Sequence, residues 1–67
     1  MLVKFTVNGQ PVEVEAETLA DLLAALGYRG YWYATALNND FVPAAKREKT
    51  TLCEGDHIEI VTPMQGG

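Results

Sequence analysis

The residues best suited to chemistry stand at the end of the chain, where the sequence finishes with Gly66-Gly67. A terminal α-carboxyl group has a pKa near ~3.5, so at neutral pH it is an anion that can attack the α-phosphate of ATP and form an acyl adenylate. A second nucleophile can then take the acyl group. Glycine places no Cβ beside the acyl carbon, which leaves both attacks unobstructed. The alternative is a frayed terminus without a role. Whether the terminus is functional has to be judged from the rest of the sequence.

The stretch from Met64 to Gly67 is predicted to be a flexible tail. Pro63 has no N–H for a sheet ladder, so it is an expected end point for the last strand. Two adjacent glycines do not hold a helix or a strand, and four extended residues reach at most ~13 Å. We therefore expect a compact domain over residues 1–63 and a thin tail over residues 64–67.

Length and composition describe one small domain. Sixty-seven residues, of which 48% are hydrophobic, suit a single globular domain with a modest core. The single cysteine excludes an internal disulfide and a cysteine-based metal cluster. Neither a signal peptide nor an apolar segment of membrane-spanning length is recognisable, so we expect the cytoplasm and no membrane partner. The net charge of −4 argues against nucleic-acid binding and favours partners with basic surfaces.

The first half of the chain predicts a β-hairpin. Val3, Phe5 and Val7 alternate with polar residues, as in a half-buried strand. Asn8-Gly9 indicates a type I′ turn, because both central positions of that turn need a positive φ. A two-residue loop sets the register and places the apolar residues on one face. The predicted partners are Val7 with Gln10, Phe5 with Val12, Val3 with Val14 and Lys4 with Glu13.

A short amphipathic helix is expected next. Thr18 can cap it, and Asp21 stands at the third helical position, as in a short form of the capping box. Leucines then recur at i, i+3, i+4 and i+7 and form one stripe: Leu19, Leu22, Leu23 and Leu26. Gly27 is placed to end the helix in the left-handed conformation. Since two to three turns are too few for a stable isolated helix, the stripe must pack on the hairpin.

The middle of the chain allows more than one structural interpretation. We interpret the aromatic run Tyr28 to Tyr33 mainly as core and loop packing, with an exposed docking patch of one or two rings as the alternative. Strands are expected at 34–37 and 41–42, with Pro43 ending the run. Two registers remain possible, and the pairs that distinguish them are Ala36 with Phe41 (loop at Asn38-Asn39) or Leu37 with Val42 (loop at Asn39-Asp40). Residues 44–52, which hold Lys46, Arg47, Glu48 and Lys49, are predicted to be a solvated connector.

The last strand completes the predicted fold. After a turn at Glu54-Gly55-Asp56, residues 57–61 alternate so that Ile58 and Ile60 face inward. The hairpin and the last strand must cover the helix together. The simplest arrangement is a mixed β-sheet packed on one main helix, with the last strand in the centre and parallel to the first. This is an α+β fold of the β-grasp type, in which a central strand would project the tail from a rigid anchor.

No catalytic constellation is recognisable, so we predict that the chain is acted on by enzymes and is not one itself. His57 is the only histidine and is interpreted as structural or merely exposed. Cys53 is interpreted as a small, partly buried hydrophobe, with a thiol that receives an acyl group as the alternative. Glu13 and Glu15 are expected to be solvated on the outer strand face. Without a phosphate-cradling glycine-rich loop, the chain is expected to bind no ATP, no other cofactor and no metal.

Short motifs along the chain are similar to those of one family. They are Val7-Asn8-Gly9, Ala36-Leu37-Asn38 followed by Val42-Pro43, and the run from Glu54 to Gly67, which combines a Gly-Asp turn, an apolar strand, a proline and the diglycine. On these residues the chain resembles the sulfur-carrier family of thiamine biosynthesis, ThiS, among the ubiquitin-like β-grasp proteins. The resemblance covers the whole chain, and the last run is its most specific part.

The resemblance implies that an ATP-dependent, ubiquitin-activating-type enzyme adenylates Gly67, which is then converted to a thiocarboxylate. The sulfur would come from cysteine through a cysteine desulfurase and would be passed on at thiazole synthase. Gly67 is then the covalent site, and Gly66, Gln65 and Met64 form the tail that partners recognise. Three other functions remain open: a sulfur carrier for molybdopterin or another pathway, a protein modifier joined to lysines, and a β-grasp interaction domain that needs no tail.

Overall fold

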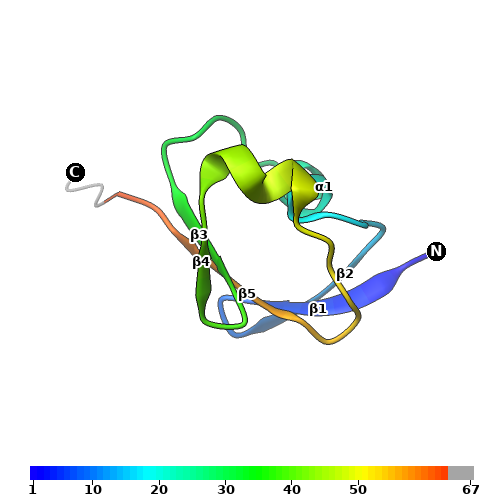
Figure 1. Cartoon of the computed structure of the whole chain (residues 1–67). Helices are drawn as coiled ribbons and strands as arrows, with labels where there is room; N and C mark the ends of the chain where they lie inside the picture. Colours follow the sequence, from blue (N-terminus) through cyan, green and yellow to red (C-terminus); the bar gives the residue numbers. More distant parts are fainter. Residues whose placement is uncertain (64–67) are drawn as a thin grey trace.

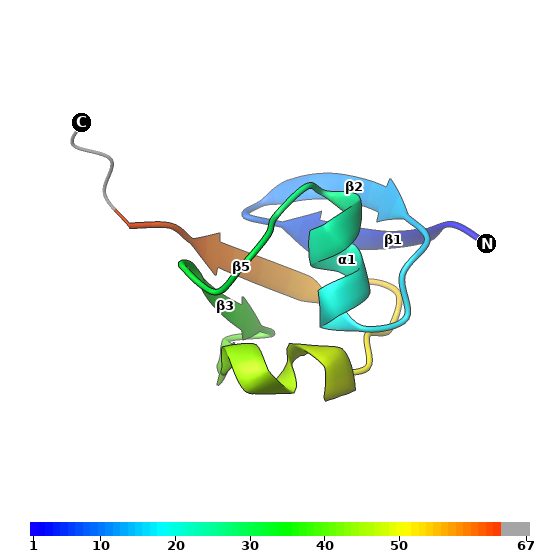
Figure 2. The same cartoon turned by 90° about the horizontal axis from the view of Figure 1, so that it is seen from above.

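The computed structural model describes residues 1–63 and contains one five-stranded sheet (Figure 1). Its elements, in chain order, are β1 (Val3–Val7), β2 (Gln10–Val14), α1 (Leu19–Ala25), β3 (Ala34–Leu37), β4 (Asp40–Val42), the 3-10 helix η1 (Ala44–Lys49) and β5 (His57–Val61). The strand order across the sheet is β2-β1-β5-β3-β4. Both helices lie on the same face of the sheet, and the other face is open (Figures 1 and 2).

The last strand occupies the centre of the sheet, as predicted. β5 pairs with β1 in parallel and with β3 antiparallel. Figure 2 shows β1 and β5 running in the same direction. The mixed sheet packed on one main helix confirms the predicted α+β fold. Because β5 is paired on both sides, it is a rigid base for the residues that follow it.

The first hairpin has the predicted register. Val3 pairs with Val14, Phe5 with Val12 and Val7 with Gln10. Lys4 pairs with Glu13 on the other face. The turn residues Asn8 and Gly9 have φ values of 52° and 81°, which is the double positive φ of a type I′ turn. Turn chemistry and strand alternation therefore agree on one pairing.

Helix α1 begins with the predicted capping box. Thr18 Oγ1 accepts a hydrogen bond from the Asp21 N–H at 3.2 Å, and Asp21 Oδ2 accepts from the Thr18 N–H at 3.2 Å. Asp21 Oδ2 also accepts from the Glu17 N–H at 3.1 Å. The backbone N–H donors of Glu17 and Thr18 stabilise the ionised carboxylate, so they lower the pKa of Asp21. Gly27 has a φ of +91°, which confirms the left-handed end of the helix.

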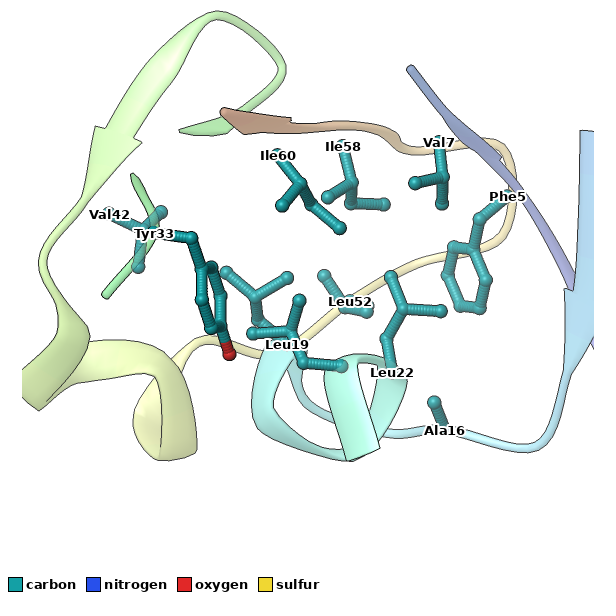
Figure 3. Packing of buried hydrophobic residues seen from close by; sticks show 11 residues of the cluster. Phe5, Val7, Ala16, Leu19, Leu22, Tyr33, Val42, Leu52, Ile58 and Ile60 are labelled. Carbon is teal, nitrogen blue, oxygen red and sulfur yellow. The ribbon is translucent and has the colours of Figure 1, made fainter. Parts of the chain in front are cut away.

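The hydrophobic core lies between α1 and the sheet (Figure 3). The buried residues that form it are Phe5, Val7, Ala16, Leu19, Leu22, Leu23, Tyr33, Val42, Leu52, Ile58 and Ile60. Leu26 packs against this cluster and is half-buried. Full burial of a leucine or phenylalanine contributes about 1.5–3 kcal/mol. Three leucines of the stripe and the two inward isoleucines of β5 thus belong to the core, as the helical spacing and the strand alternation predicted.

The second hairpin takes one of the two registers left open. Ala36 pairs with Phe41, so the loop consists of Asn38 and Asn39, whose φ values are 51° and 76°. The alternative with Leu37 opposite Val42 is wrong. Two consecutive residues at positive φ again make a type I′ turn, and asparagine tolerates that conformation better than most residues.

Two expectations for the following segment are wrong. Residues 44–52 are not a solvated connector throughout, because η1 buries Arg47, whose exposed fraction is 4%, and Leu52 joins the core. Cys53 is exposed instead of partly buried. The burial of Arg47 was not predictable from the charge run. Its partners are backbone carbonyls and a threonine far away in the sequence, which no local pattern indicates.

Candidate functional site

The predicted covalent site and its recognition residues lie outside the described part of the chain. These residues are Met64, Gln65, Gly66 and Gly67, and their roles stay predictions. The structure describes the base from which they extend, namely the end of β5 and its neighbours. Val61 is the last residue of β5, and Thr62 and Pro63 follow it, both exposed. The geometry of this base is therefore the part of the site that can be described.

The end of β5 is held from both sides. On one side, Thr35 and Ala34 of β3 pair with Ile60 and Val61. On the other side, the side chain of Asn8 accepts from the Ile60 N–H at 2.8 Å and donates to the Ile60 carbonyl at 3.2 Å. The sequence analysis assigned only a turn to Asn8. The signal for its second role is the choice of asparagine, since the turn conformation alone would also accept aspartate or glycine.

The open face of the sheet carries an apolar surface beside the end of β5. Cross-strand partners point to the same face of a sheet, and the pairs here are Ala36 with Phe41 and Ala34 with Val61, with the exposed Glu59 opposite Ala36 on that face. Phe41 is 69% exposed and Val61 63% exposed. We call these four apolar residues the outer-face patch. Because Val61 belongs to it, the patch includes the strand residue that directly precedes Thr62 and Pro63.

The aromatic run Tyr28 to Tyr33 is partly buried and partly exposed. Tyr33 is buried and Tyr28 is half-buried, with ring centroids 5.2 Å apart, so the packing interpretation holds for these two rings. Tyr31 and Trp32 are exposed, at 79% and 55%. This agrees with the alternative interpretation, in which one or two rings of the run are exposed. The Trp32 ring also contacts the Tyr33 ring edge-on, with centroids 5.6 Å apart. Trp32 is therefore attached to the core through Tyr33.

The buried Arg47 holds this run in place. Its guanidinium donates to the carbonyls of Tyr33 at 2.6 Å and Gly30 at 3.4 Å, and to Thr35 Oγ1 at 3.2 Å. It also lies 4.2 Å from the centroid of the Tyr33 ring, in cation–π geometry. Thr35 Oγ1 in turn donates to the Val42 carbonyl at 3.0 Å. A single side chain thus connects η1, the aromatic run and β3.

The other side chains considered for chemistry, namely His57, Cys53, Glu13 and Glu15, are all exposed. His57 is exposed at the start of β5, as predicted, and no group of acidic, cysteine and histidine side chains suited to a metal ion occurs in this range. Cys53 precedes β5 at the end opposite to Val61. Glu13 and Glu15 are exposed, as expected. Within the same range there is no helix of the length and apolarity needed to cross a membrane.

The fold and the site together define a ubiquitin-like β-grasp body whose central strand leads into a sequence ending in a diglycine. The model of one protein family, the ThiS family, matches residues 5–67, which is nearly the whole chain and includes that diglycine. The chain therefore belongs to the ThiS family.

Individual relatives agree with this assignment. The sulfur carrier protein ThiS of Thermus thermophilus is 33% identical over 61 residues, which span 91% of this chain and 95% of the relative. The crystal structure of the thiamine biosynthesis protein ThiS from Geobacter metallireducens is 32% identical, with a TM-score of 0.79 over 97% of this chain and 100% of that one. A solution NMR structure of a thiamine biosynthesis protein from the same organism gives a TM-score of 0.78 at 29% identity, over 97% of this chain and 88% of that one.

Proposed function

We propose that this chain is a sulfur carrier of thiamine biosynthesis, and that the carboxylate of Gly67 carries the sulfur as a thiocarboxylate. The observation that carries the proposal is membership of the ThiS family over residues 5–67, which include the diglycine. The fold supports it, because β5 is paired on both sides and leads into the tail. A similar relative is named a sulfur carrier protein, and similar structures are described as thiamine biosynthesis proteins.

The chemistry proceeds in two steps at one carbon atom. A carboxylate oxygen of Gly67 attacks the α-phosphate of ATP, and pyrophosphate leaves, which produces an acyl adenylate. A sulfur nucleophile then attacks the acyl carbon, and AMP leaves with the former carboxylate oxygen. When the sulfur arrives as a persulfide from a cysteine desulfurase, a thiol supplies two electrons to reduce the resulting acyl disulfide, and the thiocarboxylate is released. Glycine at both tail positions keeps the acyl carbon accessible.

Partner enzymes supply the catalysis in this scheme. An adenylating enzyme binds the ATP and the tail, a cysteine desulfurase provides sulfur, and thiazole synthase receives it, all in the cytoplasm. The chain itself contributes no cofactor. The outer-face patch, which includes Val61 and Phe41, supports a docking role beside the tail, since exposed aromatic and aliphatic side chains on one face favour protein contacts. The net charge of −4 favours association with basic partner surfaces.

Mass spectrometry tests the proposal. With a cognate adenylating enzyme, ATP and sodium sulfide, the intact chain should gain the mass of one sulfur replacing one oxygen, and fragmentation should place the change on Gly67. Deletion of Gly67, or Gly67→Val, should abolish the gain while the circular dichroism spectrum stays that of the wild type. Normal thiocarboxylate formation in the deletion variant would contradict the proposal. Conjugates of higher mass, formed on lysines in lysate with ATP, would indicate a protein modifier instead.

A further inference from the structure

Asn8 extends the sheet beyond the point where the backbone of β1 leaves it. The regular parallel pairing of β1 with β5 covers Thr6 with His57 and Val7 with Ile58, and the Asn8 N–H donates to the Ile58 carbonyl at 2.9 Å. In a regular ladder the next partners of Ile60 would be the carbonyl of residue 8 and the N–H of residue 10. At Asn8, however, φ is 52°, and the backbone turns away into the hairpin loop.

The Asn8 side chain replaces both missing backbone partners. Its Oδ1 accepts from the Ile60 N–H at 2.8 Å, and its Nδ2 donates to the Ile60 carbonyl at 3.2 Å. An amide is the one short side chain that offers an acceptor and a donor with the spacing of a peptide group. Aspartate offers acceptors only, and glycine offers nothing. The side chain therefore adds one more paired residue to the β1 side of β5.

We propose that Asn8 is a positioning residue for the carrier tail, and that it fixes the point on β5 from which the tail begins. The inference rests on the proposed function, because it assigns Asn8 a role in presenting Gly67 to the adenylating enzyme. With Asn8 in place, the N–H and the carbonyl of Ile60 are both bonded on the β1 side while β3 pairs along the other side of β5, and Val61 of the outer-face patch keeps a fixed position next to the tail. Without it, the β1 side of Ile60 is open, and the end of β5 frays.

Fraying at the end of β5 should weaken binding of the partner enzyme more than it slows the reaction at Gly67. A partner that holds the outer-face patch and the tail together needs a defined distance between them, and each freed residue changes the reach of the tail by about 3.3 Å. Ordering a freed residue on binding costs conformational entropy. The atoms that react at Gly67 are unchanged, so the loss appears in KM and not in kcat, as expected when equal binding of ground and transition states is removed.

The second hairpin offers a matched control at the other end of the same strand. Asn38 also stands first in a type I′ turn, with a φ of 51°, and its Oδ1 accepts from the His57 N–H at 2.9 Å. It therefore holds the start of β5, away from the tail. Glycine suits a positive φ at both positions, so Asn8→Gly and Asn38→Gly keep the turns and remove only the side-chain bonds.

The first measurement is amide hydrogen exchange on the free proteins. Asn8→Gly should accelerate exchange at Ile60 at least about tenfold, and Asn38→Gly should accelerate it at His57 and leave Ile60 unchanged. The second is ATP–pyrophosphate exchange by the cognate adenylating enzyme at varied carrier concentration. Asn8→Gly should raise KM on the order of 3- to 10-fold with kcat within about twofold, while Asn38→Gly keeps the wild-type KM. Asn8→Asp, which retains the acceptor for the Ile60 N–H, should fall between the wild type and Asn8→Gly in both measurements.

The outcomes separate this inference from the proposed function. A wild-type chain that supports no pyrophosphate exchange would contradict the function, whereas the exchange rates at Ile60 are read without any enzyme. An active wild type with an unchanged KM in Asn8→Gly would overturn the inference alone. An equal rise of KM in both glycine variants would also overturn it, because the effect would then be one of general stability. If Asn8→Gly does not fold, the same comparison is made between Asn8→Asp and Asn38→Asp.

Discussion

The two hairpins of this protein use the same turn and differ in what that turn does. Each has a two-residue type I′ loop that begins with asparagine, at Asn8 and at Asn38, and each places its first strand beside β5. Because β1 is parallel to β5 and β3 is antiparallel, the two asparagines reach opposite ends of that strand. Only Asn8 stands on the tail side. Strand direction, and not turn chemistry, decides which hairpin can influence the tail.

The hairpins also differ in how they are held to the rest of the protein. The first contributes Phe5 and Val7 to an apolar core. The second buries a polar cluster, in which Thr35 is 2% exposed and the Arg47 guanidinium donates to two carbonyls and one hydroxyl. Among residues 1–63, every buried side-chain nitrogen or oxygen has a hydrogen-bond partner. The first hairpin is therefore stabilised by apolar burial, whereas the second also buries Val42 but adds a satisfied polar network. Substitutions of Phe5 and Arg47 test this contrast.

The largest effect is expected at Phe5, the apolar anchor of the first hairpin. Phe5→Ala should reduce the free energy of unfolding by about 3–4 kcal/mol, because it removes a buried ring and leaves a cavity. Urea denaturation measures the loss. Lys4→Ala, at the exposed neighbouring position, is the control and should change stability by less than ~0.5 kcal/mol. A loss below about 1 kcal/mol in Phe5→Ala would mean that burial does not hold this hairpin.

The next effect is expected at Arg47, the polar anchor of the second hairpin. Arg47→Met should cost about 2 kcal/mol, because the Tyr33 carbonyl loses its 2.6 Å donor and stays buried. Arg47→Lys is the informative partner, since an ammonium keeps the charge but lacks the planar fork that reaches three acceptors, so it should not restore stability. Full stability of Arg47→Met in urea denaturation would show that desolvating the guanidinium offsets its bonds.

A smaller, pH-dependent effect is expected at Asp21, in the connection between the hairpins. The N–H groups of Glu17 and Thr18 lower its pKa in the folded protein below the ordinary value near ~3.9. A lowered folded-state pKa stabilises the fold above the unfolded value and loses this contribution as the pH falls through the folded value. Asp21→Asn should therefore lower Tm at pH 7 and differ less from the wild type near pH 3.

Thr18→Ala serves as the control for this pH dependence. It removes the hydroxyl that accepts from the Asp21 N–H, so this capping contribution of about 1 kcal/mol should be lost at both pH values. The hydroxyl also takes a minor part in lowering the pKa of Asp21, so only a small pH-dependent loss is added. The bonds from the backbone of Glu17 and Thr18 to the Asp21 carboxylate remain available. An equal difference in Tm between Asp21→Asn and the wild type at both pH values would show that ionisation of Asp21 does not contribute.

The smallest effect is expected at Cys53, at the end of β5 that faces away from the tail. The thiol is exposed, and the N–H of this residue, which donates to Asp56 Oδ2 at 2.8 Å, is unaffected by the side chain. Cys53→Ser should change stability by less than ~0.5 kcal/mol and leave sulfur transfer at the wild-type rate. Loss of transfer in the folded variant would show that the thiol takes part in the chemistry.

The sequence alone determined the features that depend on neighbours along the chain. Alternation and the Asn8-Gly9 turn specified the first hairpin to the residue, and the capping box, the leucine stripe and Gly27 specified α1, since turns, caps and amphipathic faces involve residues only a few positions apart. The motif run to Gly67 indicated the family. The roles of Gly67, Gly66, Gln65 and Met64 stay predictions, because those residues lie beyond the described part of the chain.

Only the tertiary structure decided the features that join distant segments. Asn38-Asn39-Asp40 allowed two registers of nearly equal local quality, and pairing of β3 with β5 accompanies the one adopted. Arg47 looked like a solvated charge, but its partners at Gly30, Tyr33 and Thr35 belong to another segment. Asn8 looked like a turn residue, yet its side chain bonds Ile60, 52 positions away. Hydrogen bonds between residues so far apart form only after the chain has brought their backbones together, so a local pattern of residues does not specify the partners.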